Sequence, residues 1–193
     1  MTGRRGQRVL FAIAIAGLIA VGGRAVAGDP GIKRSVGRYV APNVVLVNQD
    51  GARVRLQSLT ESGKPVVLDF IYGTCTTICP VLSAGYTSIQ AKLGPDTRKV
   101  QLISISIDPE HDTPKIMKGY LRQYRAKPGW DFLTGSREDI DRVMKAFDSY
   151  VPDKMSHKQV TFIRAQGSGA WVRIDGLPSS SELMDEIGKA GKR

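Results

Sequence analysis

The sequence predicts an α/β fold in which a mixed central β-sheet is flanked by helices. Short apolar runs typical of buried strands alternate along the chain with segments whose apolar residues recur at helical spacing. Such alternation favours a parallel core, to which a late hairpin adds antiparallel strands. The chain has 193 residues, 41% hydrophobic and 24% charged, and no internal repeat. This is the ordinary composition of one globular domain.

The first 27 residues have the features of an export segment. Three arginines at positions 4, 5 and 8 precede an apolar run at 9–21, and Ala-Val-Ala at 25–27 resembles a cleavage site. The run is short for a bilayer span, which needs about 20 apolar residues, although glycines 22 and 23 extend it. We therefore expect residues 1–27 to be a signal peptide or membrane anchor. The protein would then be exported, to the periplasm or the outer face of the inner membrane.

A linker and a hairpin are expected next. Residues 28–42 contain Gly, Pro and charge with little periodicity, which indicates a linker before a domain at 43–193. An apolar run at 44–47 and an alternating segment at 54–56 flank the dipeptide Asp50-Gly51. This pattern predicts a β-hairpin.

Two buried strands and two helices form the predicted centre of the fold. Residues 66–71 form a mostly apolar stretch, as in a strand covered on both faces, and a second buried strand is expected at 100–107. Pro80 opens a helix that continues at helical spacing until Gly94. Thr113, followed by proline, is a good N-cap for a helix through residue 124.

The C-terminal part predicts a further strand, a second hairpin and two helices. In order, these are a strand at 132–134, a helix capped by Ser136 and running through Phe147, a hairpin of 160–163 with 171–174, and a last helix through Ile187. Ser179 with Glu182 three residues later forms a capping box, which marks the start of that last helix.

The net charge alone excludes no class of partner. The formal net charge is +10, and four arginines of the leader contribute to it. The remaining 24 basic and 18 acidic residues give +6 after the leader. This is consistent with an ordinary solvated basic surface, or with one that favours anionic lipid or an acidic partner. No basic run is interleaved with aromatic residues, so we expect no nucleic-acid partner.

The two cysteines, Cys75 and Cys79, lie between a buried strand and the helix that Pro80 opens. Pro80 at the first helical position makes Cys79 the expected N-cap. Unpaired N–H groups and the helix dipole stabilise a thiolate there and lower its pKa. Three intervening residues leave room for an ion between the sulfurs, and a flexible loop can still close a disulfide. Thiolates bind Cu(I) or zinc, so the pair alone leaves the metal open. The alternative is that the two cysteines have no chemical role and are simply small, buried, apolar side chains.

Three blocks of sequence resemble the SCO/SenC family, copper proteins that assist assembly of cytochrome c oxidase. The segment Tyr72-Gly73-Thr74-Cys75 to Cys79-Pro80 looks like that family's metal motif. Residues 105–114, Ile-Ser-Ile-Asp-Pro-Glu-His-Asp-Thr-Pro, resemble its second signature, and Phe-Leu-Thr-Gly-Ser at 132–136 resembles a third. The resemblance covers roughly residues 40–190.

This resemblance implies a thioredoxin-like fold and a third copper ligand, a histidine before a late strand. That position falls on His157, which gives the expected ligand set Cys75, Cys79 and His157. Ser156 stands where the family commonly has an aspartate, so Asp153 or a backbone carbonyl is expected to orient the imidazole. Two thiolates and one imidazole suit three-coordinate Cu(I) and tolerate Cu(II), whereas a structural zinc site normally has four protein ligands.

Three neighbouring side chains have weaker claims to a role. His111 lies in the charged loop and is expected near but outside the site, with an accessory role left open. The Met155 thioether suits Cu(I), but methionine is more often core filler or part of an exposed loop. Asp108 either balances the charge of the site or caps the following helix.

Three functional hypotheses follow, and each of them depends on the cysteines. The first is a copper metallochaperone that takes copper from an upstream donor and delivers it to a cytochrome c oxidase subunit or another copper-site protein. The second is a thiol–disulfide oxidoreductase that keeps the oxidase cysteines reduced, since close thiols oxidise in an exported protein unless reduced or metal-bound. A third, a peroxiredoxin-like peroxidase, matches Thr76-x-x-Cys79 but has Tyr72 where a proline is expected. Only the first requires His157.

Overall fold

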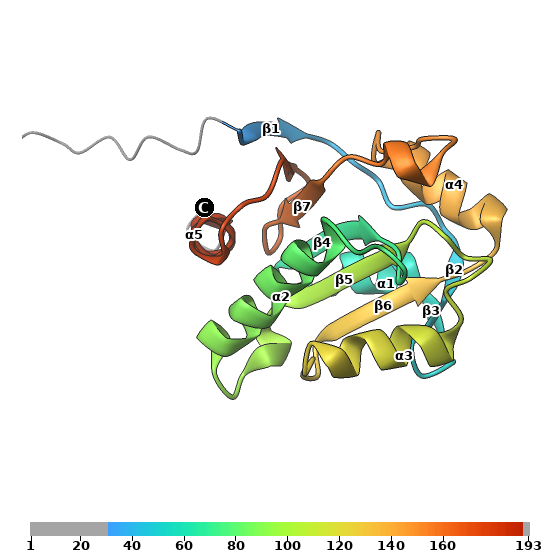
Figure 1. Ribbon diagram of the computed structural model, residues 1–193. Helices are drawn as coiled ribbons and strands as arrows, with labels where there is room; N and C mark the ends of the chain where they lie inside the picture. The colour runs from blue at the N-terminus through green and yellow to red at the C-terminus, as the bar shows by residue number, and fades with distance from the viewer. Residues whose placement is uncertain (1–30, 191–193) are drawn as a thin grey trace, which may run out of the picture.

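An eight-stranded mixed sheet forms the centre of the protein in the computed structural model, which describes residues 31–190 (Figure 1). Its strand order is β1-β8-β7-β4-β5-β6-β2-β3. Among the neighbouring strands of the described residues, only the pairs β4–β5 and β5–β6 are parallel. The strands are β1 Lys33–Gly37, β2 Val45–Asn48, β3 Arg53–Arg55, β4 Val66–Ile71, β5 Gln101–Ser106, β6 Trp130–Thr134, β7 Val160–Arg164 and β8 Trp171–Asp175. The export segment expected at 1–27 lies outside the described residues.

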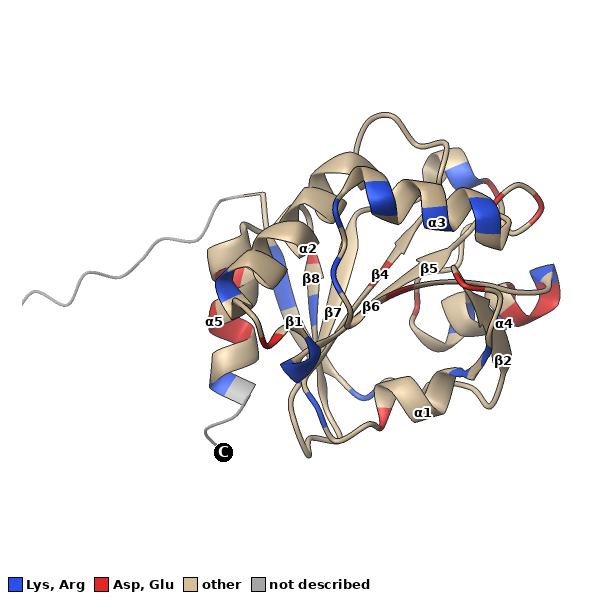
Figure 2. Cartoon of the chain, turned by 90° about the horizontal axis from the view of Figure 1, so that it is seen from below, with Lys and Arg blue, Asp and Glu red and all other residues tan. Residues whose placement is uncertain are grey.

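Helices cover both faces of the sheet. They are α1 Leu56–Thr60, α2 Cys79–Leu93, α3 Pro114–Gln123, α4 Arg137–Ala146 and α5 Ser180–Ala190, with short 3-10 turns at Thr97–Lys99 and Lys154–Ser156. One face carries α2, α3 and α5, and the other carries α1 and α4 (Figure 2). Within residues 31–190, no helix combines the length and hydropathy that a membrane crossing requires.

The predicted α/β fold with a mixed central sheet is confirmed, together with most of its local signals. All residues of β4 and β5 are buried, as the sequence analysis expects for these two strands. The Thr113 hydroxyl accepts a hydrogen bond from the Ile116 N–H at the start of α3. The Ser179 hydroxyl accepts from the Glu182 N–H, and the Glu182 carboxylate accepts in return from the Ser179 N–H. These are the two reciprocal bonds of a capping box.

The structure corrects three boundaries. Residues 33–37, placed by the sequence within a linker at 28–42, form β1 and pair antiparallel with β8. Four of its five residues are exposed, so backbone hydrogen bonds rather than an apolar pattern place this strand in the sheet. Helix α2 begins at Cys79, with Ile78 as its N-cap. Leu56, predicted as the last residue of the hairpin's second strand, instead begins helix α1, whose five residues are too few to show a helical period.

Phe147, which follows α4, is the centre of an aromatic cluster on one face of the sheet. Its ring packs edge-on against Phe162 at 5.1 Å and Trp171 at 5.3 Å between centroids. It also contacts Phe70 at 6.1 Å and stacks on Tyr39 at 5.7 Å. Because Phe70 lies near the end of β4, this cluster also supports the strand that leads into the cysteine loop.

We expect Phe147→Ala to lower the free energy of unfolding by about 3–5 kcal/mol, because it removes a fully buried ring and leaves a cavity. Urea denaturation followed by circular dichroism measures the change. Val40→Ala, at a side chain that is 72% exposed, is the control and should change stability by less than about 0.5 kcal/mol. A loss of that small size in Phe147→Ala would show that the cluster does not support the fold.

Candidate metal centre

The loop from β4 to α2 brings the two cysteines together. The Cys75 N–H donates to the Tyr72 carbonyl at 3.1 Å, which turns the chain sharply after the strand. At the first residue of α2, the Cys79 N–H donates to the Cys75 sulfur at 3.4 Å. Both cysteines are buried and both are free thiols. The sequence prediction that they meet at the start of this helix is therefore confirmed.

The two thiols have opposite tendencies to ionise. Burial opposes ionisation of Cys75, but hydrogen bonds from the Cys79 thiol and from the N–H groups of Cys79, Thr77 and Ile78 outweigh it and lower its pKa to about 7. Burial, together with the hydrogen bond to Cys75, raises the pKa of Cys79 well above its usual range. At neutral pH the pair therefore offers a partly ionised Cys75 beside a protonated Cys79, so Cys75 is the better nucleophile of the two.

Gly73 is held by the loop that follows β5. Its N–H donates to both carboxylate oxygens of Asp112, at 3.1 and 3.0 Å. The Ser106 hydroxyl donates to the same carboxylate at 2.5 Å. A Cβ atom at position 73 would lie 2.7 Å from an Asp112 oxygen. Glycine is thus required here for close approach of the carboxylate.

His157 lies at the same end of the sheet. Its Nε2 is 2.8 Å from the Phe70 carbonyl, and since a carbonyl only accepts, Nε2 carries the proton. Burial lowers the pKa of the imidazole, which keeps the ring neutral. Its Nδ1 is then an unprotonated nitrogen, buried and without a hydrogen-bond partner among the described residues. Of the two orienting groups left open by the sequence, the backbone carbonyl holds the ring, while Asp153 accepts from the Met155 N–H instead.

The three predicted ligands do not meet at one point. Within residues 31–190, no three His, Cys, Asp or Glu side chains are close enough together to hold a metal ion. Cys75 and Cys79 form a pair, and His157 is bound to the strand from which their loop emerges. The donor types fit copper, because thiolate and imidazole are both good copper ligands, but a three-ligand site requires the cysteine loop or the His157 loop to move.

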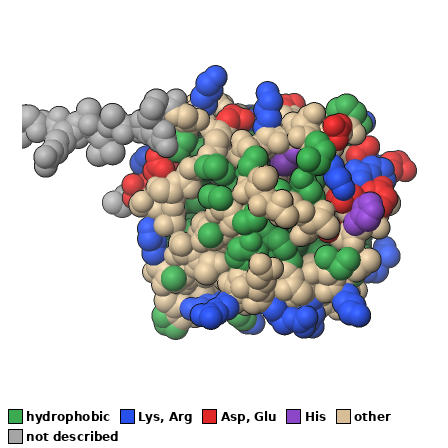
Figure 3. Space-filling view, in the orientation of Figure 1, with side chains coloured by type: hydrophobic (Ala, Val, Ile, Leu, Met, Phe, Trp, Pro, Cys, Tyr) green, Lys and Arg blue, Asp and Glu red, His purple; other side chains and the backbone are tan. Residues whose placement is uncertain are grey.

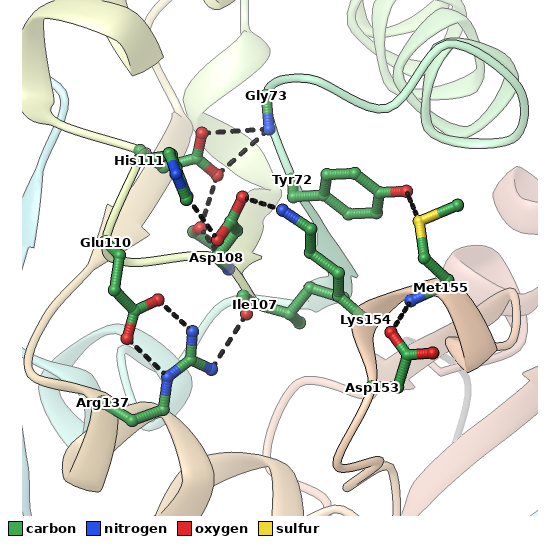
Figure 4. A network of polar contacts seen from close by, with 12 residues as sticks. Tyr72, Gly73, Ile107, Asp108, Glu110, His111, Arg137, Asp153, Lys154 and Met155 are labelled. Carbon is green, nitrogen blue, oxygen red and sulfur yellow. Dashed lines mark hydrogen bonds and ion pairs between the residues drawn. The ribbon is translucent and has the colours of Figure 1, made fainter.

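An ion pair holds the loop that precedes His157. The Lys154 ammonium lies 2.6 Å from Asp108, whose other oxygen is 2.9 Å from His111 Nδ1 (Figure 4). Burial opposes ionisation of Asp108, but the hydrogen bonds from Lys154 and His111 outweigh it and lower its pKa. Asp108 therefore balances local charge rather than capping α3. No local pattern in the sequence indicates the role of Lys154, because its partner is 46 residues away.

A buried carboxyl group lies beneath the site. Asp69, on β4, is fully buried, and neither of its oxygens makes a hydrogen bond of normal geometry with a described residue. Ser104 is opposite it on β5. Burial raises the pKa of Asp69 to about 7, with only partial compensation from Ser104. Sequence reasoning missed this group, although an aspartate within a buried apolar strand is an available signal.

A sheet whose central strand leads through a cysteine-bearing loop into a helix N-terminus defines a thioredoxin-like protein with a dithiol site. The SCO1/SenC family model matches residues 34–190, and the chain belongs to this family. The family resemblance and the thioredoxin-like fold expected from the sequence are thereby confirmed.

Individual relatives agree with this assignment. The chain is 40% identical over 116 residues to a SCO1 protein homolog of Bacillus subtilis (strain 168), an alignment that covers 58% of this chain and 59% of that protein. The chain thus spans less than two thirds of that relative.

Solved structures align over more of the chain. One is BsSco, a member of the Sco family of cytochrome c oxidase assembly proteins in which a disulfide switch was identified. It aligns with a TM-score of 0.66 at 31% identity, and the alignment covers 79% of this chain and 94% of the BsSco chain. Copper-bound ScoI of Bradyrhizobium japonicum has a TM-score of 0.63 at 27% identity, over 80% and 98% of the two chains.

Alkylation by iodoacetamide should follow the ionisation of Cys75 alone, with a midpoint near pH 7, the value to which its hydrogen bonds lower its pKa. In Cys79→Ala, which removes the donating thiol, the midpoint should rise by about one pKa unit, the effect of one hydrogen bond to a charged group. In Cys79→Ser the hydroxyl still donates, so the midpoint should stay low. An unchanged midpoint in Cys79→Ala would refute this account of the thiolate.

Asp69 should make the folded state less stable as the pH rises. Because its pKa rises from 3.8 to about 7 on folding, the folded protein binds more protons than the unfolded chain between these values. The group's contribution is therefore complete below pH 4 and lost by pH 7, a change of about 4 kcal/mol. Chemical denaturation across this range should show that loss in the wild type and in Asp50→Asn, at an exposed carboxyl, but not in Asp69→Asn. Equal slopes in all three would contradict the burial argument.

Proposed function

We propose that this protein is a copper metallochaperone that binds copper through Cys75, Cys79 and His157 and delivers it to a respiratory oxidase during cytochrome c oxidase assembly. The observation that supports it most is the set of donors at the end of β4. They are a thiol that ionises near pH 7, a second cysteine whose backbone N–H donates to that sulfur, and an imidazole with a free, unprotonated Nδ1.

The His157 ring is prepared for metal binding by its own hydrogen bond. Since the Phe70 carbonyl takes the Nε2 proton, Nδ1 has a lone pair and no competing partner among the described residues. A metal-ligating histidine usually donates its other N–H to a carboxylate or a backbone carbonyl, which fixes the tautomer and orientation. The Phe70 carbonyl fills that role where the family's aspartate is replaced by Ser156.

We further propose that the ion binds the cysteines first and that His157 joins afterwards. The two cysteines are already in contact. The imidazole is held on β4, and within the described residues it does not yet form a three-ligand group with them. A ligand that joins last can also leave first. This reversibility supports a carrier rather than a permanent metal enzyme, because delivery requires an ion that is released to the recipient.

The surface around the cysteine loop supports docking of a recipient protein. Val81 on the first turn of α2 and Ile116 on the first turn of α3 are 51% and 45% exposed. Hydrophobic side chains gather at the centre of the face that carries these helices, with Lys and Arg side chains along its edge (Figure 3). A small apolar surface with a charged rim is typical of transient protein contacts. We propose that the copper is delivered outside the cytoplasm, as the expected export segment at residues 1–27 suggests.

A thiol–disulfide oxidoreductase is the second candidate. The Cys75 thiolate next to the Cys79 thiol is the arrangement that a dithiol reductant needs, and the similar structure of BsSco is described as containing a disulfide switch. This function uses the same two sulfurs but has no role for the free Nδ1 of His157.

His157→Ala should weaken Cu(I) binding by about 100-fold or more, because even outer partners of metal ligands contribute 10–100-fold. The affinity is measured by competition with bicinchoninate under anaerobic conditions. His111→Ala is the matched control and should keep the wild-type affinity. Both variants should retain the wild-type reduction potential of the cysteine pair. Wild-type copper affinity in His157→Ala would exclude the three-ligand site and favour the oxidoreductase.

A further inference from the structure

Met155 is a large apolar side chain on the surface next to the cysteine loop, and 74% of it is exposed. Single exposed hydrophobic residues are common and need no explanation on their own. What distinguishes Met155 is its fixed surroundings. Its sulfur lies 3.7 Å from the Tyr72 hydroxyl, across 83 residues of sequence (Figure 4).

The backbone on both sides of Met155 is held in place. Asp153 accepts a hydrogen bond from the Met155 N–H at 2.9 Å. Lys154 is bound to Asp108 at 2.6 Å and lies over the Tyr72 ring at 5.4 Å from its centroid. Because Asp108 neutralises the nearby ammonium, the thioether is not next to an unbalanced positive charge. The methionine is therefore presented in a defined position, although its side chain is in solvent.

Tyr72 connects Met155 to the cysteine pair. The phenol contacts the Met155 sulfur on one side. On the other side, the Cys75 N–H donates to the Tyr72 carbonyl at 3.1 Å. Tyr72 therefore contacts the Met155 thioether through its side chain and the cysteine loop through its backbone.

We propose that Met155 is a receiving ligand for Cu(I): its exposed thioether binds the ion at the surface and passes it across Tyr72 to Cys75 and Cys79. This rests on the proposed function, and adds a second binding position for the same cargo. A soft, uncharged thioether selects Cu(I) over zinc and binds it more weakly than a thiolate does. Because Cu(I) binds more strongly to a thiolate than to a thioether, the ion moves from Met155 towards the cysteines.

The transfer is a ligand exchange without oxidation or reduction. The Met155 sulfur withdraws its lone pair as the Cys75 thiolate donates one, and the copper stays Cu(I). When Cys79 binds, its S–H proton passes to water. No other reactant is needed.

The first test measures uptake of Cu(I) from its bicinchoninate complex by stopped flow, using the full reduced chain. Met155→Leu keeps the volume and removes the sulfur, and it should slow uptake by about tenfold, the lower range for a group that assists metal binding. Because the thiolates still determine the final state, the equilibrium affinity should change by less than about threefold. Met184→Leu, on α5, is the control and should take up copper at the wild-type rate. Wild-type uptake by Met155→Leu would overturn the proposal.

The second test detects the thioether directly and separates this proposal from the function on which it rests. In a Cys75→Ser/Cys79→Ser variant with ¹³C-labelled methionine methyl groups, Cu(I) should shift the Met155 signal but not that of Met184, and Zn²⁺ should shift neither. An unmoved Met155 signal would overturn the receiving role while the wild type still binds copper through its cysteines. Loss of the metallochaperone function itself would instead appear as absent copper binding in the wild type.

Discussion

The hydrogen bond from His157 Nε2 to the Phe70 carbonyl is the contact on which the site depends. It joins a loop near the end of the chain to the strand that leads into the cysteine loop, 87 residues earlier. Because the carbonyl accepts, it also determines which imidazole nitrogen is free. Strand β4 thus positions all three donors: Cys75 and Cys79 through the loop that follows it, and His157 through its backbone.

Two carboxylates of the loop after β5 maintain this arrangement. Asp112 holds the N–H of Gly73 at the beginning of the cysteine loop, and Asp108 holds Lys154 on the opposite loop. Adjacent parallel strands end at the same edge of the sheet, which is why a loop between them can reach both sides of the site. The histidine loop is attached by these polar contacts and by Val151, which packs against the core. An ion that binds all three donors must therefore bring the cysteine loop and His157 closer together.

The sequence predicts the elements and the cysteine placement well because these depend on local signals. Apolar runs, Thr113, Ser136 and the capping box act over a few residues. Strand β1 and the partners of His157 depend on contacts between distant segments, and no local pattern encodes them. The prediction of copper rests on the family resemblance, since thiolates alone fit zinc as well. The positions of Tyr72 and Met155 relative to each other required the fold.

X-ray absorption spectroscopy of the copper-loaded protein tests the central claim most directly, because it reports the atoms bonded to the metal. The account predicts two sulfur neighbours and one imidazole nitrogen around each Cu(I), at one ion per chain. A spectrum with sulfur neighbours alone would contradict it, since the His157 ring would then have only the structural role that its bond to Phe70 already provides.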